Sequence, residues 1–111
     1  MKIVSEPISF DLVRQQHATF FERMVKIVVD LERRLIALDA EMHADLEQLL
    51  LEQGSEQQHL WGANLYFEGP LWIEFTSLIN IRPAQGNRGM EVENPQLRDQ
   101  IDSLVHSLIL R

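Results

Sequence analysis

The clearest pattern in the chain is an alternation of apolar and polar residues on both sides of residues 68–70. Apolar side chains recur at every second position in 61–67 and again in 71–82, which is typical of strands with one buried face. A loop over 68–70 places Leu65 opposite Ile73, and the apolar residues of both strands then share one face. The pattern therefore predicts an antiparallel hairpin whose buried residues include Ile73, Phe75 and Ile79.

Residues 25–39 fit two patterns. Met24, Val28 and later leucines make a helical stripe, but the run 25–29 is rich in β-branched residues, which are stiff in helices and favoured in strands. We therefore expect a second hairpin that turns near residues 32–34. A short apolar pair at residues 3–4 is expected to add an edge strand.

Three segments carry helical signals. A first helix is expected over residues 10–24, with Ser9 as its N-cap. A short helix is expected over 44–53, because Gly54 is well placed to end it in a left-handed cap. A last helix is expected to begin at Asn94-Pro95, an N-cap residue followed by a proline at the first helical position.

These elements predict an α+β fold in a single domain that covers residues 1–111. Two antiparallel hairpins form one sheet, the N- and C-terminal helices pack on one face, and the short helix lies between the hairpins in the sequence. Residues 83–95 contain two glycines and two prolines, so they are expected to form one long loop.

Composition narrows the classes of function. The chain has 111 residues, a net charge of −7 and no cysteine, so disulfides, thiolate zinc sites and thiol nucleophiles are excluded. An acidic surface repels phosphate backbones, so we expect no nucleic-acid partner. No apolar run approaches the roughly 20 residues of a spanning helix, so we expect no membrane partner. The first residues are too polar for a secretion signal, which favours a cytoplasmic protein.

The segment 41–45 contains three groups that can bind metals. Glu41, His43 and Asp45 occupy alternate positions, and on an extended segment all three side chains would point the same way. One imidazole and two carboxylates could hold a divalent ion. The simpler alternative is that Asp45 caps the adjacent helix, Glu41 is solvated and His43 packs at a strand end.

The segment 80–89 is the most distinctive stretch of the chain. It combines two glycines, which let backbone N–H groups approach a ligand, with several amides and two arginines. Two guanidinium groups could bind a small anionic ligand such as a carboxylate or phosphate. Candidate ligand-binding residues are Asn80, Arg82, Gln85, Asn87 and Arg88. The alternative is a structural loop whose polar side chains bond to nearby backbone groups.

Two hypotheses of different kinds follow. In the first, a small-molecule or metal site forms between the segments 41–45 and 80–88, with His43 or Glu74 as the general base if it is catalytic. In the second, the chain is a non-enzymatic homodimeric interaction module. The observation behind the second is that the polar face of the 61–82 hairpin also carries large apolar residues that need cover: Leu60, Tyr66, Trp72 and Leu78.

The surroundings of Arg82 distinguish between the two interpretations of the segment 80–89, a ligand site and a structural loop. It follows a strand and precedes a proline, so we expect its guanidinium to be paired rather than free in solvent. The candidate partners within the chain are Glu74, Glu41 and Asp45. If a carboxylate of the chain itself pairs with Arg82, the loop is structural. If Arg82 and Arg88 instead point into an open pocket, the loop is an anion site.

Several segments together resemble a small prokaryotic domain family of unknown function. They are 41–45 (Glu-Met-His-Ala-Asp), 54–55 (Gly-Ser), 60–66 (Leu-Trp-Gly-Ala-Asn-Leu-Tyr) and 79–88 (Ile-Asn-Ile-Arg-Pro-Ala-Gln-Gly-Asn-Arg). The resemblance covers almost the whole chain, and it implies an α+β domain with no assigned activity. The family has glycines near the first turn and before the Glu-x-His-Ala-Asp motif, where this chain has Arg33-Arg34 and Asp39-Ala40.

Overall fold

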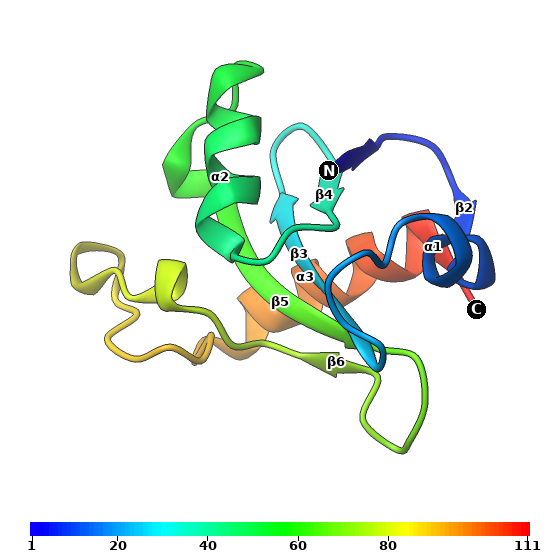
Figure 1. Ribbon diagram of the computed structural model, residues 1–111. Helices are drawn as coiled ribbons and strands as arrows, with labels where there is room; N and C mark the ends of the chain where they lie inside the picture. The colour runs from blue at the N-terminus through cyan, green and yellow to red at the C-terminus, as the bar shows by residue number, and fades with distance from the viewer.

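A computed structural model describes residues 1–111 and shows an α+β fold with three helices and a five-stranded antiparallel sheet (Figure 1). The sheet order is β1-β4-β3-β5-β6. Its strands are β1 (Lys2–Val4), β3 (Met24–Asp30), β4 (Leu35–Leu38), β5 (Leu60–Tyr66) and β6 (Ile73–Glu74). The helices are α1 (Phe10–Gln16), α2 (His43–Glu52) and α3 (Pro95–Leu108), and a separate parallel pair joins β2 (Ile8–Ser9) to β7 (Ile109–Leu110).

The first hairpin is confirmed. β3 and β4 pair antiparallel, and the carboxylate of Asp30 accepts hydrogen bonds from the backbone N–H groups of Glu32 and Arg33 at 3.0 and 2.9 Å. Arg34 (φ 55°) and Asp39 (φ 73°) adopt left-handed backbone conformations. Glycine is the residue that adopts such angles without strain, so the two side chains are held there by the turn and by the end of β4. The expected edge strand is also present, because β1 pairs with β4.

The second hairpin has the expected register but a shorter second strand. Leu65 pairs with Ile73, as predicted, but β6 ends at Glu74 instead of continuing to residue 82. The hydroxyl of Ser77 accepts a hydrogen bond from the N–H of Ile79 at 3.2 Å and begins the 3-10 turn Leu78–Asn80. The chain therefore leaves the sheet, and of the three residues expected to be buried Ile73 is buried, whereas Phe75 and Ile79 are only half-buried.

The first helix is shorter than predicted. Ser9 caps α1 by accepting a hydrogen bond from the N–H of Leu12, but the helix ends at Gln16 instead of residue 24. Thr19 donates its N–H and its hydroxyl to the carboxylate of Asp39, at 2.8 and 2.9 Å, and these bonds tie the segment after α1 to the end of β4. The sheet thus recruits Met24 into β3, and tertiary pairing overrides the apolar helical spacing.

The other two helices confirm their predicted caps. Gly54 follows α2 with φ 99°, and the N–H of Ser55 bonds back to the carbonyl of Leu50 at 2.9 Å. Asn94 caps α3 by accepting from the N–H groups of the next turn, with proline at the first helical position. None of the helices is long and apolar enough to span a bilayer.

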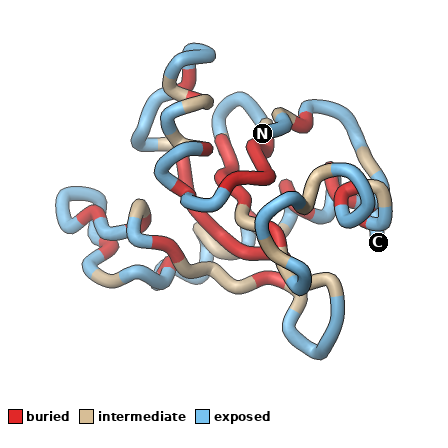
Figure 2. The backbone as a smooth tube through the Cα atoms, in the orientation of Figure 1, coloured by how far each residue is buried: buried red, intermediate tan, exposed pale blue.

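The sheet carries an apolar cluster on each face, and Figure 2 shows buried backbone along its central strands. Trp61, Ala63 and Leu65 of β5 belong to the larger cluster, which also contains core residues of α1 and α3. The smaller cluster joins β3 and β4 to α2 through Leu46 and Leu50. Part of the α2 face of β5 borders the N-terminus of α2 and the segment around residues 76–80. The candidate site lies there.

Candidate functional site

Asn80 replaces a missing strand beside β5. Its side chain accepts a hydrogen bond from the N–H of Gly62 at 2.8 Å and donates to the carbonyl of the same glycine at 2.9 Å. A carboxamide can pair in this way because it carries one acceptor and two donors, as a backbone segment does. The approach is so close that a Cβ on Gly62 would lie 2.6 Å from Cβ of Ser77. Asn80, fully buried, thus completes the sheet.

Arg82 is paired within the chain. Its Nε donates to the carbonyl of Ile79 at 3.0 Å, and its Nη1 donates to the carbonyl of Gln57 at 2.6 Å. The remaining donors reach Gln85 Oε1, the Leu60 carbonyl and, at 3.5 Å, Glu47 Oε2. The guanidinium also lies 4.5 Å from the ring centroid of Trp61. Burial lowers the pKa of Arg82, and the Glu47 carboxylate partly offsets this effect.

The expectation that Arg82 is paired is confirmed, but the expected partners are wrong. The carboxylate is Glu47 of α2, not Glu74, Glu41 or Asp45. The reason is that the 3-10 turn Leu78–Asn80 redirects the chain toward α2, whereas a continued strand would have kept Arg82 on the sheet face that carries Glu74.

Other polar residues of the loop are also engaged with the backbone. The carboxamide of Asn87 donates to the carbonyls of Asn80, Gly89 and Glu91, and its oxygen accepts from the N–H of Glu93 at 3.0 Å. Gln85 donates to the carbonyl of Gln58, and the side chain of Arg88 is exposed. The five candidate ligand-binding residues therefore do not converge on one open pocket.

The three candidate metal ligands lie on two sides of the α2 N-terminus. Glu41 and Asp45 line a hollow of about 480 Å³ beside Phe20, whereas His43 lines a different pocket. No group of three His, Cys, Asp or Glu side chains in the chain is arranged to hold a metal ion.

The pocket that contains His43, called the His43 pocket below, has a volume of about 270 Å³ and lies between the N-terminus of α2, β5 and the turn Leu78–Asn80. Its apolar lining is Met42, Ala44, Leu78, Ile79 and Met90. Its polar lining is Lys26, His43, Asn64, Thr76 and Ser77. Part of the 41–45 segment and the flanks of the 80–88 loop thus share one concave surface, although most of the predicted residues do not.

His43 is held in place by the sheet. Its Nε2 donates to the carbonyl of Ala63 at 2.8 Å, which leaves Nδ1 as the free ring nitrogen. Burial lowers the pKa of His43, and the charge of Lys26 lowers it further. The Ala63 carbonyl, the Asn64 side chain and the Glu74 carboxylate act in the opposite direction and are outweighed.

A partly buried polar network around Glu74 includes Asn64, whose side chain lines the same pocket as His43. The Nδ2 of Asn64 donates to Glu74 Oε1 at 2.8 Å, and the hydroxyl of Tyr66 donates to the same oxygen at 3.1 Å. Burial and the Glu74 carboxylate raise the pKa of Tyr66. Asn64 Oδ1 is buried and has no hydrogen-bond partner. Of the two residues predicted as general bases, Glu74 therefore bonds directly to Asn64, whereas His43 lines a pocket with Asn64 without a hydrogen bond to it.

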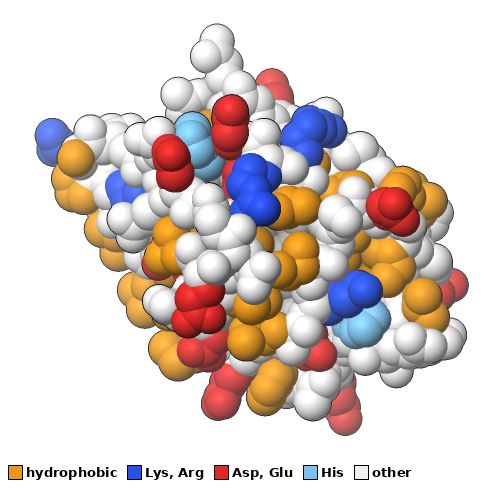
Figure 3. Space-filling model, turned by 90° about the horizontal axis from the view of Figure 1, so that it is seen from above, with side chains coloured by type: hydrophobic (Ala, Val, Ile, Leu, Met, Phe, Trp, Pro, Cys, Tyr) orange, Lys and Arg blue, Asp and Glu red, His pale blue; other side chains and the backbone are white.

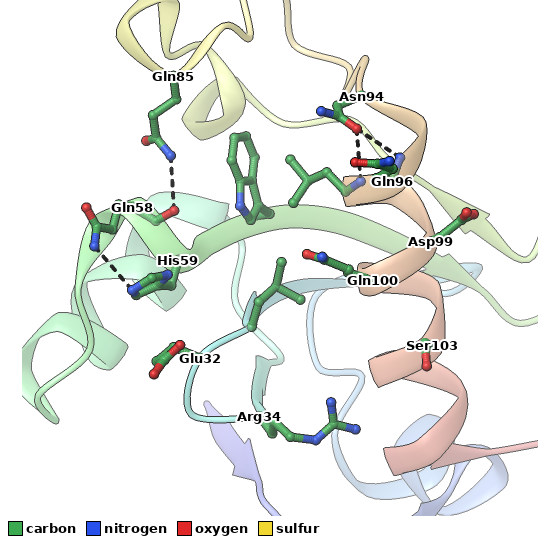
Figure 4. Close-up of a pocket in the computed structure, with 13 residues that line it drawn as sticks. Glu32, Arg34, Gln58, His59, Gln85, Asn94, Gln96, Asp99, Gln100 and Ser103 are labelled. Carbon is green, nitrogen blue, oxygen red and sulfur yellow. Dashed lines mark hydrogen bonds between the residues drawn. The ribbon is translucent and has the colours of Figure 1, made fainter.

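A larger hollow of about 760 Å³ lies on the other side of the sheet (Figure 4). It opens between the β3–β4 turn, the start of β5 and the polar side of α3, where Figure 4 shows Gln96, Asp99, Gln100 and Ser103 along one helix. Most of its polar lining residues are exposed, and none of the buried unpaired polar atoms of the chain belongs to it. This hollow is wide and solvated.

Sequence reasoning missed Asn64 and Lys26. Both occupy alternate positions of strands, on the face opposite the larger apolar cluster, where polar residues are ordinarily solvated. The signal that could have identified Asn64 is the predicted Leu65–Ile73 register, because it also places Asn64 opposite Glu74.

The comparisons with known proteins give a family and nothing more specific. Residues 2–108 match the model of the family described as "Protein of unknown function (DUF5674)", which bears out the resemblance seen in the sequence. No curated protein and no solved structure matches the chain.

Proposed function

The chain belongs to DUF5674, a family without an assigned activity, and we propose from its geometry that it binds a small molecule in the His43 pocket. The proposal keeps His43 from the sequence prediction and replaces the arginine loop with Asn64 and Lys26. Arg82, Asn80 and Asn87 support the wall of this pocket from behind, because they fix the turn that carries Leu78 and Ile79.

The observation that carries the proposal is the unpaired oxygen of Asn64. The residue is only 7% exposed, and a buried acceptor without a partner costs about 1–3 kcal/mol. Rotating the amide does not solve the problem, because Nδ2 would then leave the Glu74 carboxylate. A buried acceptor that a fold leaves unpaired beside a pocket is a reason to expect a donor from a ligand.

The walls of the pocket suit a partly apolar ligand. Met42, Leu78 and Met90 are 54%, 66% and 42% exposed. Methionine adapts its shape to different partners, and ligand sites combine apolar walls with a few well-placed polar groups. The volume of about 270 Å³ limits the ligand to a small metabolite.

The methionines provide a direct test. Met42 and Met90 line the pocket, whereas Met24 lies in β3 outside it. We expect a ligand from a panel of small organic acids, alcohols and amides to shift the methyl NMR signals of Met42 and Met90 and to leave that of Met24 in place.

A variant with a blocked pocket and a matched variant with the same substitution elsewhere complete this experiment. Ala44→Phe adds a ring at the exposed pocket mouth and should abolish the shifts, whereas Ala84→Phe adds the same ring at an exposed site outside the pocket. If no compound moves the two signals, or if Ala44→Phe leaves the shifts unchanged, the proposal is wrong.

A homodimeric interaction module is the second candidate, favoured by the exposed side chains of Met42, Leu78 and Met90. In Figure 3 hydrophobic side chains gather along the left margin, the side on which Figure 1 shows the segment between β6 and α3. Leu60 and Trp72 do not contribute to such a surface, because Leu60 is buried in the α2 cluster and Trp72 packs on Phe10. A dimer in light scattering that Leu78→Asp dissociates would support this candidate, and a monomer would exclude it.

A further inference from the structure

The polar groups of the His43 pocket indicate what kind of small molecule fits it. We infer that its ligand is a short hydroxycarboxylic acid, with the hydroxyl group one or two carbons from the carboxylate. This inference rests on the function proposed above and adds the chemical class of the ligand.

A carboxylate is favoured by two features at one side of the pocket. Lys26 lines this side of the pocket, and its ammonium group, 5.3 Å from the centroid of the Phe21 ring, lowers the pKa of His43 by its charge. The first residues of the ten-residue helix α2 line the same pocket, and Met42, the N-cap, provides no side-chain acceptor for the N–H groups of the first turn. Free N–H groups and the positive end of the helix dipole together favour an anion.

A hydroxyl group is favoured by two acceptors at the floor of the pocket. Asn64 Oδ1 is unpaired, and its Nδ2 is fixed on Glu74. His43 Nδ1 is the ring nitrogen that remains after Nε2 donates to Ala63, so in the neutral ring it is also an acceptor. Asn64 and His43 line the same pocket, and Asn64 acts on the pKa of His43, so the two acceptors are neighbours.

The cationic side and the two acceptors at the floor of the pocket together favour a ligand that carries both a hydrogen-bond donor and an anionic group. A hydroxyl hydrogen can bond to one of the two acceptors after a small movement of the Asn64 side chain, while the carboxylate lies at Lys26 and the helix. An ammonium group in place of the hydroxyl would be repelled by Lys26, which favours a hydroxy acid over an amino acid. The apolar walls of Leu78, Ile79 and Met90 then cover a short carbon chain.

The test measures how tightly four probes bind to the whole chain. The probes differ from one another in single chemical groups, and the methyl NMR signals of Met42 and Met90 report binding. The probes are 2-hydroxybutyrate, 3-hydroxybutyrate, butyrate and 2-hydroxybutyramide. We expect at least one of the two hydroxy acids to bind about tenfold more tightly than butyrate, because butyrate leaves the buried acceptors unpaired. The amide, which lacks the charge, should be weaker by a similar factor.

The lysines supply a matched pair of variants. Lys26→Met should remove the preference of the hydroxy acid over its amide, whereas Lys2→Met, at an exposed edge position, should keep it. Butyrate or the amide binding as tightly as both hydroxy acids would overturn the inference and leave the proposed function standing. If neutral compounds alone shift the two methionines, the ligand class is wrong. If neither they nor any of the four probes shift them, the proposed function fails as well.

Discussion

The guanidinium of Arg82 donates four hydrogen bonds within the chain and forms an ion pair with Glu47 at 3.5 Å. A lysine cannot reach the carbonyls of Ile79, Gln57 and Leu60 together, because its donors radiate from one atom. We expect Arg82→Lys to lower the free energy of unfolding by about 2–4 kcal/mol, since at least two buried carbonyls lose their donors. Chemical denaturation measures the change, with the exposed Arg88→Lys as control. An unchanged midpoint for Arg82→Lys would mean that the guanidinium is free to bind a ligand.

His43 makes a second prediction at the residue scale, on the pH dependence of stability. Burial lowers the pKa of this imidazole in the folded chain below its unfolded value of about 6.5. The unfolded state therefore binds more protons below that pH, and the contribution of His43 to stability falls as the solution is acidified through about pH 6.5. We expect NMR titration to show the His43 ring still neutral as the pH falls below about 6.5. Titration of His43 at or above the ordinary pKa would contradict this.

At the scale of elements, the sequence predicted well those features that local chemistry determines. The Asn94 cap of α3, the glycine after α2 and the Leu65–Ile73 register depend on residues close together in the chain or on strict alternation. The errors occurred where contacts between residues far apart in the sequence determine the secondary structure. The carboxylate of Asp39 ends the helical stripe after α1, and the alternation of residues 75–82 hides a turn capped by Ser77. The parallel pairing of β2 and β7 has no local signal at all.

The contact between β5 and the turn Leu78–Asn80 makes a prediction about Gly62. A Cβ at this position would lie 2.6 Å from Cβ of Ser77, an atom that cannot move without its backbone. We expect Gly62→Ala to destabilise the fold by about 1–3 kcal/mol, as overpacking of buried sites does. Gly89→Ala is the matched control, because its added Cβ would meet only Glu93 Oε1 at 3.5 Å, an ordinary contact. Equal melting temperatures for Gly62→Ala and the control would show that this turn moves freely away from the sheet.

For the whole molecule, the candidate site could be predicted only in part, because residues from elements far apart in the sequence form it. His43 and Glu74 were recognised as chemical groups, but the hydrogen bond from Asn64 to Glu74 depends on how β5 and β6 pair and where β6 stops. Lys26 reaches the same pocket from β3, which neighbours β5 across the sheet rather than along the chain. Side chains from two strands, a helix and the turn Leu78–Asn80 converge there, and no spacing in the sequence encodes that meeting.

The two ends of the chain make the last prediction, because the fold joins them. β2 pairs in parallel with β7, and Ile109 is buried in the larger apolar cluster beside core residues of α1 and α3, although it lies two residues from the end of the sequence described. Terminal residues ordinarily tolerate change unless they are tied down in this way. We therefore expect Ile109→Ala to cost about 2–5 kcal/mol of unfolding free energy, the range for large-to-small substitutions in a core. Leu110→Ala is the control, since Leu110 is exposed and pairs only through its backbone. Similar unfolding midpoints for the two variants would show that the β2–β7 pair frays in solution and that the core ends within α3.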